Sequence, residues 1–137
     1  MNTAVEQGYK EDELMKVGCF MKKVLIADDA LFMRNSLRMM LEKNGFEVVG
    51  VVDNGLDAVS LADKLSPDIV TLDITMPKLN GIEALRKIKR YHPEISVVML
   101  TSLKGESILK ECISIGATNF IIKPFKEKTL IEIVTKS

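Results

Sequence analysis

The stretch VLIADD, residues 24–29, places four apolar residues directly before two aspartates. An apolar run of this length is typical of a short strand that is buried on both faces of a sheet. Four similar runs follow it, and segments with a helical repeat of apolar residues separate them. The expected strands are 24–27, 47–52, 69–72, 96–100 and 119–122. The alternation predicts an α/β fold in which helices cover both faces of one parallel sheet.

Five amphipathic helices are expected from apolar residues at three- and four-residue spacing. Helix-ending residues support their bounds, because Gly45 ends the first helix, Pro67 follows the second and Gly116 ends the fourth. The third helix opens after Gly81 and stops before Pro93. The apolar residues expected in the core are Met33, Leu37, Met40, Leu41, Ala58, Leu61, Ala62, Leu65, Ile82, Leu85, Ile88, Ile108, Leu109, Cys112, Ile115, Leu130, Ile133 and Val134.

Composition limits the class of protein. The 137 residues are 47% apolar and 28% charged, which is typical of one globular domain. The 19 basic residues equal the 19 acidic ones, so no binding to nucleic acid is expected. The apolar runs are far shorter than the roughly 18 residues of a membrane span, so no membrane insertion is expected. Cys19 and Cys112 form no paired motif, which favours the reducing cytoplasm.

Residues 1–20 lack the pattern of the rest of the chain. Their apolar residues are scattered among charged ones, and the regular pattern starts only after Met21. We therefore expect an N-terminal extension over 1–20 that is not part of the fold and has no role in the chemistry, followed by one domain over 21–137.

Polar residues follow four of the expected strands. Asp28 and Asp29 come after the first strand, Asp73 after the third, Thr101 after the fourth and Lys123 after the fifth. In an open parallel sheet, ligands bind outside the carboxyl ends of the strands, where the strand order reverses. With the order 2-1-3-4-5 this place lies between the first and third strands. The three aspartates are therefore expected to face one another.

Carboxylates this close repel one another, at a cost on the order of 4 kcal/mol for each pair about 4 Å apart. A divalent cation would relieve the repulsion, and oxygen ligands without histidine or cysteine suit Mg²⁺, or Mn²⁺, better than zinc. A second oxygen of Asp73 would then be free to attack phosphorus. The ammonium of Lys123 and the hydroxyl of Thr101 would stabilise the charge of the phosphoryl group.

Each of these residues also has a purely structural interpretation. Asp28 or Asp29 could cap the first helix, Asp73 could hold a turn, and Lys123 could be a solvated strand end. The joint placement of these residues at the ends of four strands favours a functional site over separate structural roles.

Four motifs resemble the receiver domain of bacterial response regulators. They are VLIADD at 24–29, LDITMPKLNG at 72–81, LTS at 100–102 and KPF at 123–125. The resemblance covers residues 22–136. It implies a flavodoxin-like, doubly wound (βα)5 fold with a five-stranded parallel sheet in the order 2-1-3-4-5.

The resemblance also implies roles for site residues. Asp73 would be the phosphoacceptor, Asp29 and Asp73 would bind Mg²⁺ directly, and Asp28 would act partly through water. The backbone carbonyl of Thr75 would be a further metal ligand. The peptide bond between Lys123 and Pro124 would be cis.

Thr101 and Phe120 match the switch pair of the family, in which the hydroxyl moves to the phosphoryl group and the ring turns inward. The surface that changes would be made by the fourth helix, the fifth strand and the fifth helix, around Lys110, Phe120 and Lys126. A simpler interpretation is that Phe120 is only a core residue of its strand.

The function implied is that of a stand-alone, CheY-like chemotaxis regulator, expected to be a monomer in the cytoplasm. It would not be an enzyme but a phosphoacceptor that assists its own phosphorylation and dephosphorylation. A histidine kinase and a flagellar motor switch protein would be its partners. The alternatives are a phosphorelay intermediate that serves a histidine phosphotransfer protein, and an interaction module that is not phosphorylated. An aspartyl phosphatase is disfavoured, because Thr75 stands where its second acid would be.

Overall fold

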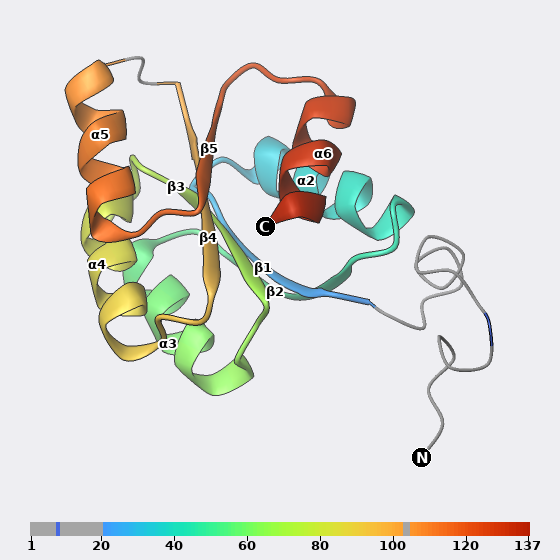
Figure 1. The fold of residues 1–137 in the computed structure, drawn as a ribbon, viewed down its shortest axis with the longest axis horizontal. Helices are drawn as coiled ribbons and strands as arrows, with labels where there is room; N and C mark the ends of the chain where they lie inside the picture. Colours follow the sequence, from blue (N-terminus) through green and yellow to red (C-terminus); the bar gives the residue numbers. More distant parts are fainter. Residues whose placement is uncertain (1–7, 9–20, 103–104) are drawn as a thin grey trace.

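Strands and helices alternate from Lys23 to Lys136 in the computed structural model, which describes residue 8, residues 21–102 and residues 105–137 (Figure 1). The strands are β1 (Lys23–Ala27), β2 (Glu47–Val52), β3 (Ile69–Asp73), β4 (Ser96–Thr101) and β5 (Asn119–Ile122). The helices are α2 (Leu31–Lys43), α3 (Gly55–Leu65), α4 (Gly81–Tyr91), α5 (Glu106–Ile115) and α6 (Glu127–Lys136). Apart from Gly8, the expected extension over 1–20 lies outside the described residues, as does Cys19, so the extension stays a prediction.

The five strands form one parallel sheet in the order β2-β1-β3-β4-β5. This confirms the predicted fold. Three strands are one residue longer than expected, because β1 already pairs with β2 at Lys23, and the ladders of β3 and β4 continue for one more residue. Asp73 pairs with Leu100, and Thr101 pairs with Ile122. Two of the expected site residues therefore belong to the sheet itself, which fixes their backbones.

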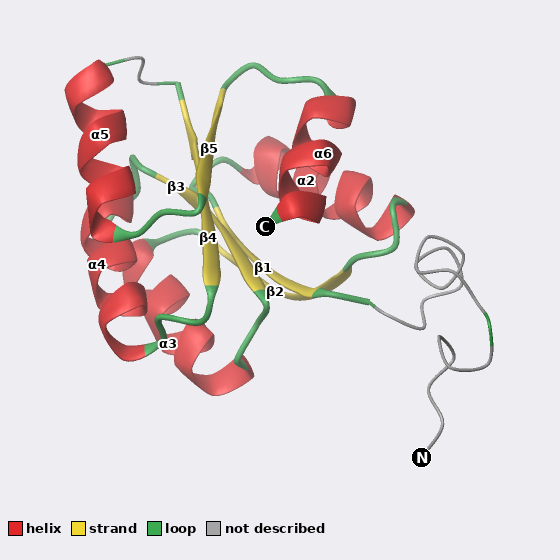
Figure 2. Ribbon diagram, in the orientation of Figure 1, coloured by secondary structure: helices red, strands yellow, loops and turns green. Residues whose placement is uncertain are grey.

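Helices cover both sides of the sheet, with α2 and α6 on one side and α3, α4 and α5 on the other (Figures 1 and 2). Side chains of a strand alternate between the two sides, so each side has its own core. Leu25 and Met99 belong to the core under α3, α4 and α5, whereas Ile26 and Val98 belong to the core under α2 and α6. Cys112 is fully buried, as predicted.

The helices end where the sequence predicts. Asn44 is the C-cap of α2, and Gly116 ends α5 with a φ of 123°, a left-handed conformation that glycine adopts without strain. Asn80 caps the start of α4, and His92 follows its last turn. Among the described residues, no helix is long and apolar enough to cross a membrane.

Candidate functional site

Two neighbouring strands bring the acidic residues together. β1 and β3 pair in the middle of the sheet, with Ala27 opposite Leu72. Asp28, which follows β1, and Asp73, the last residue of β3, therefore end up side by side. Both are buried, at 1% and 7% exposure, whereas Asp29 is exposed. One carboxylate oxygen from each of the three lies within 4.8 Å of the others.

Lys123 bridges two of these carboxylates. Its Nζ donates a 2.6 Å hydrogen bond to Oδ2 of Asp28 and lies 3.5 Å from Oδ2 of Asp73. The residue follows β5, where its backbone N–H donates to the carbonyl of Thr101 at 2.8 Å. The peptide bond between Lys123 and Pro124 is cis, as the resemblance implies. One partly buried ammonium thus partly neutralises two buried carboxylates.

The surroundings of Asp73 make it a weak acid for a carboxyl group. Burial raises its pKa from 3.8 to about 6, against the opposing effect of the Lys123 ammonium. The charges of Asp28 and Asp29 also raise the pKa, while the N–H of Thr75 lowers it. Burial and like charge are the two effects that a bound cation would offset.

The aspartates do not cap helices. The N-cap of α2 is Ala30, and the N-cap of α4 is Asn80, so the helix-cap interpretation of Asp28 and Asp29 is wrong. The turns after the strands do use the carboxylates. Oδ1 of Asp28 accepts the N–H of Ala30 at 2.9 Å, and Oδ1 of Asp73 accepts the N–H of Thr75 at 3.3 Å. These turns aim the carboxylates at one another.

The donor set of this cluster fits a hard divalent cation. Its three groups are carboxylates, and among the described residues neither histidine nor cysteine joins it. Oxygen ligands of this kind suit Mg²⁺ or Mn²⁺ better than zinc, which usually has histidine or cysteine among its ligands. The backbone of Thr75 is close by, because its N–H bonds to Asp73. The geometry is therefore consistent with a cation site at Asp28, Asp29 and Asp73.

Thr101 and Phe120 lie on neighbouring strands. Thr101 is the last residue of β4 and is 1% exposed. Phe120 pairs with Met99 of that strand and packs, partly buried, against the core under α3, α4 and α5. Because alternate residues of a strand share a side, Thr101 and Met99 face the same way. The two residues of the predicted switch therefore lie on the same side of the sheet. In this conformation Phe120 packs against the core, as the simpler interpretation expects.

Two residues near the site were not predicted from the sequence. A Cβ added to Gly81 would lie 2.0 Å from the carbonyl oxygen of Asp73, so only glycine allows α4 to start so close to β3. The Asn-Gly pair at 80–81 indicated a helix start but not this contact. Arg34 donates from Nη1 to the carbonyl of Asp28 at 2.9 Å. No sequence signal places an arginine of one helix on a particular carbonyl.

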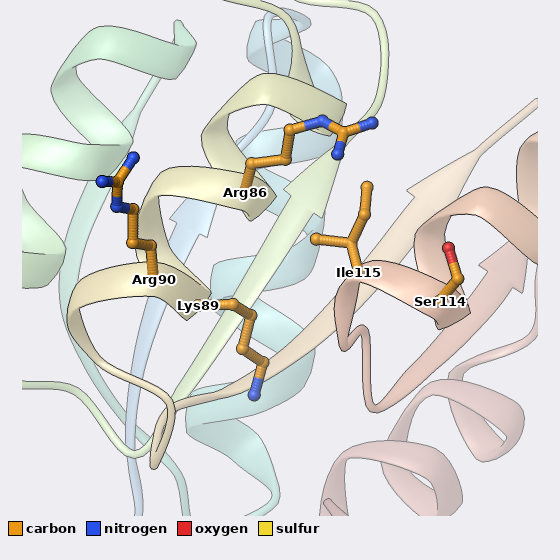
Figure 3. Close-up of a pocket in the computed structure, with 5 residues that line it drawn as sticks. All are labelled: Arg86, Lys89, Arg90, Ser114 and Ile115. Atoms are coloured by element: carbon orange, nitrogen blue, oxygen red, sulfur yellow. The ribbon is translucent and has the colours of Figure 1, made fainter.

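A separate hollow of about 450 Å³ lies between the C-terminal halves of α4 and α5, and its wall includes three basic residues (Figure 3). Their side chains point in different directions. Arg86 is paired with Glu111 at 2.8 Å, and the ammonium of Lys89 donates to the backbone carbonyl of Ile95. The basic groups thus do not converge on a common anion, and we assign no site there.

Comparison with known proteins covers nearly all of the regular part of the chain. The model of the response regulator receiver domain matches residues 24–135. "Protein CcdB" of Bacillus subtilis is 44% identical over 116 residues, which are 85% of this chain and 97% of that protein. "Chemotaxis protein CheY" of Thermotoga maritima is 42% identical over 115 residues, which are 84% of this chain and 96% of that protein.

A solved structure agrees in fold as well as in sequence. A chain of the CheX–CheY–BeF3–Mg²⁺ complex of Borrelia burgdorferi is 34% identical, with a TM-score of 0.82, over 84% of this chain and 87% of that chain. The strand order, the acidic cluster at the strand ends and these matches agree with one another. The chain belongs to the response regulator receiver domain family.

Proposed function

We propose that Asp73 accepts a phosphoryl group and that the transfer switches the binding surface of the protein. One observation carries the proposal. Three carboxylate oxygens lie within 4.8 Å of one another, and the Lys123 ammonium lies 3.5 Å from Asp73. A carboxylate nucleophile, ligands for a cation and a nearby ammonium are the parts that phosphoryl transfer to an aspartate needs.

In the proposed step, an oxygen of Asp73 attacks the phosphorus of a phosphohistidine on a histidine kinase. A P–O bond forms while the P–N bond breaks, and the imidazole leaves with the electron pair. A Mg²⁺ or Mn²⁺ ion bound by Asp28, Asp29, Asp73 and the carbonyl of Thr75 would supply positive charge to the phosphoryl oxygens. Water attack on the phosphorus of the aspartyl phosphate, with return of the electron pair to Asp73, would reset the protein.

Lys123 and Thr101 would respond to the new charge. The ammonium of Lys123 now donates to Asp28, and a phosphoryl group on Asp73 would offer it acceptor oxygens close by. The Thr101 hydroxyl would donate to another phosphoryl oxygen, and Phe120 would turn into the space that Thr101 leaves. The change would be expressed on the face made by α5, β5 and α6, around Lys110, Phe120 and Lys126.

Chemotaxis is the output that we propose. The support is that relatives called "Chemotaxis protein CheY" are 42% identical to this chain over 84% or more of its length. A flagellar motor switch protein would then bind the switched face, and the protein would act as a cytoplasmic monomer. Titration of that partner with the unphosphorylated and phosphorylated protein tests the output. Tighter binding after phosphorylation is expected, and equal affinity would contradict switching.

Intact mass spectrometry tests phosphoryl transfer. The purified protein is incubated with a small acyl phosphate and Mg²⁺, and a gain of one phosphoryl group is expected. The gain should vanish with a chelator and in Asp73→Asn. Asp63→Asn is a matched control, because Asp63 is an exposed aspartate that pairs with His92 on another part of the surface. No gain in the wild-type protein would contradict the proposal.

A further inference from the structure

The turn between β1 and α2 carries two of the three clustered carboxylates, so its conformation decides where they point. Besides the bond that Oδ2 of Asp28 accepts from Lys123, three hydrogen bonds hold this turn at Asp28. The Asp28 N–H donates to the carbonyl of Val52 at 3.1 Å, and its Oδ1 accepts the N–H of Ala30 at 2.9 Å. The third bond is made by its backbone carbonyl, which accepts Nη1 of Arg34 at 2.9 Å.

The bond from Arg34 differs from the other two because it comes from the body of a helix. Arg34 lies in the first turns of α2, and its own N–H donates to the carbonyl of Ala30 at 3.0 Å. Its guanidinium reaches back over this turn to Asp28, where it is partly buried. The turn is therefore fastened to β2 on one side and to α2 on the other.

The charge of Arg34 also acts on a nearby carboxylate, that of Asp53. The pKa of Asp53, at the end of β2, is lowered mainly by a hydrogen bond from Asn54 and further by the charge of Arg34. The guanidinium thus lies close enough to Asp53 to affect its carboxylate, and it contacts the backbone carbonyl of Asp28. Arg38, one turn later on α2, instead pairs with Glu42 on the exposed surface of the same helix at 2.7 Å. Two arginines of one helix therefore have different surroundings.

We infer that Arg34 is a positioning residue, which holds the backbone of Asp28 so that Asp28 and Asp29 present their carboxylates to a divalent cation together with Asp73. The inference rests on the proposed function, because it assumes that the cluster binds Mg²⁺. Arginine suits this task better than lysine, since its rigid, planar donor group loses less freedom for each hydrogen bond it forms. Removal of a residue that orients a metal ligand without itself binding the metal typically weakens metal binding 10- to 100-fold.

The test is calorimetric titration of Mg²⁺ into the wild-type protein, Arg34→Met, Arg34→Lys and Arg38→Met. We expect Arg34→Met to raise the Kd for Mg²⁺ by about tenfold. Arg34→Lys keeps the charge and one possible donor to the Asp28 carbonyl, and it should bind Mg²⁺ more tightly than Arg34→Met. Arg38→Met should bind like the wild-type protein. Wild-type affinity in Arg34→Met would overturn the positioning role.

A second readout needs no metal. In the presence of a chelator, the amide of Ala30 should exchange its hydrogen faster in Arg34→Met than in the wild-type protein, because its acceptor on Asp28 is no longer held in place. The amide of Asp57, which donates to Asn54 at 2.9 Å in another turn, should keep its rate. Equal acceleration of both amides would indicate a general loss of stability and would overturn the inference.

These results separate the two proposals. A wild-type protein that binds no Mg²⁺ contradicts the proposed function. A wild-type protein that binds Mg²⁺, together with an Arg34→Met variant of equal affinity, contradicts only the role of Arg34.

Discussion

Among single residues, Asp73 shows most clearly how burial shapes the chemistry of the site. The carboxyl group is 7% exposed, and burial raises its pKa to about 6. In the unfolded chain the same group has a pKa near 3.8. The folded protein therefore binds this proton more tightly than the unfolded chain does. The stability that protonated Asp73 contributes is full below pH 3.8 and is lost as the pH rises to about 6.

Asp73→Asn should consequently stabilise the protein, and the gain should depend on pH. The variant removes a buried charge, so above pH 6 we expect its free energy of unfolding to exceed that of the wild-type protein by on the order of 1 kcal/mol. The difference should shrink between pH 6 and 4. Urea denaturation followed by circular dichroism, with a chelator present, measures it. A difference that does not change with pH would contradict the raised pKa.

Thr71 lies two residues before Asp73 in β3 and has an unusual environment. Its hydroxyl is buried and has no hydrogen-bond partner among the described residues. The residues opposite it are Ile26 and Val98, both apolar. An unpaired buried hydroxyl costs about 1–3 kcal/mol, whereas a methyl group of the same size fits an apolar site. We therefore expect Thr71 to reduce the stability of the core next to Asp73.

Thr71→Val should raise the free energy of unfolding by about 1 kcal/mol. Thr118→Val is the matched control, because the Thr118 hydroxyl accepts the N–H of Val97 at 3.2 Å. The control should lower the stability, since it leaves that N–H without its partner. Chemical denaturation of both variants checks the prediction. Destabilisation by Thr71→Val would mean that the hydroxyl has a partner in solution.

Among the elements, α4 is placed by its contact with β3. The helix begins at Gly81, whose N–H donates to the carbonyl of Ile74 at 2.7 Å. No side chain fits there, because a Cβ would lie 2.0 Å from the carbonyl oxygen of Asp73. The start of α4 therefore packs directly against the backbone of Asp73.

Gly81→Ala should displace Asp73 and slow its phosphorylation by an acyl phosphate, with a loss of about 1–3 kcal/mol in stability. Asn80→Ala separates the two effects. This substitution removes the N-cap of α4, because Oδ1 of Asn80 accepts the N–H of Glu83 at 3.0 Å. It should lower the free energy of unfolding by about 1 kcal/mol. Its phosphorylation rate should stay that of the wild-type protein. If both variants phosphorylate at the wild-type rate, the contact between Gly81 and Asp73 does not position the nucleophile.

The order of the elements could be predicted from the sequence because it depends on local patterns. Apolar runs gave all five strands to within one residue, and glycine or proline marked most helix ends. The meeting of Asp28 and Asp73 follows from strand order alone. The side-chain contacts could not be predicted in this way. The ammonium of Lys123 lies 2.6 Å from Asp28 and 3.5 Å from Asp73. That Lys123 bonds to Asp28 and not to Asp73 depends on rotamers and packing that no sequence pattern encodes.

In the whole molecule, the acidic cluster and the predicted switch residues occupy different places on the sheet. The side chains of Asp28, Asp73 and Lys123 meet beyond the strand ends, where the clustered oxygens lie. Thr101 and Phe120 share the side that α3, α4 and α5 cover. A phosphoryl group on Asp73 would therefore act first on Thr101 at the end of β4, and through Thr101 on Phe120 of the neighbouring strand β5. This arrangement can couple phosphorylation to a change of the face made by α5, β5 and α6, provided that Asp73 is the residue that is phosphorylated.

Trapping of the phosphorylated residue tests whether the phosphoryl group is bound to Asp73. The protein is phosphorylated with an acyl phosphate and Mg²⁺, reduced with borohydride, which converts an aspartyl phosphate to homoserine, and then digested for peptide mass spectrometry. We expect homoserine at position 73 and unchanged aspartate at positions 28 and 29. Homoserine at another position, or none in a protein that has gained a phosphoryl group, would contradict this expectation.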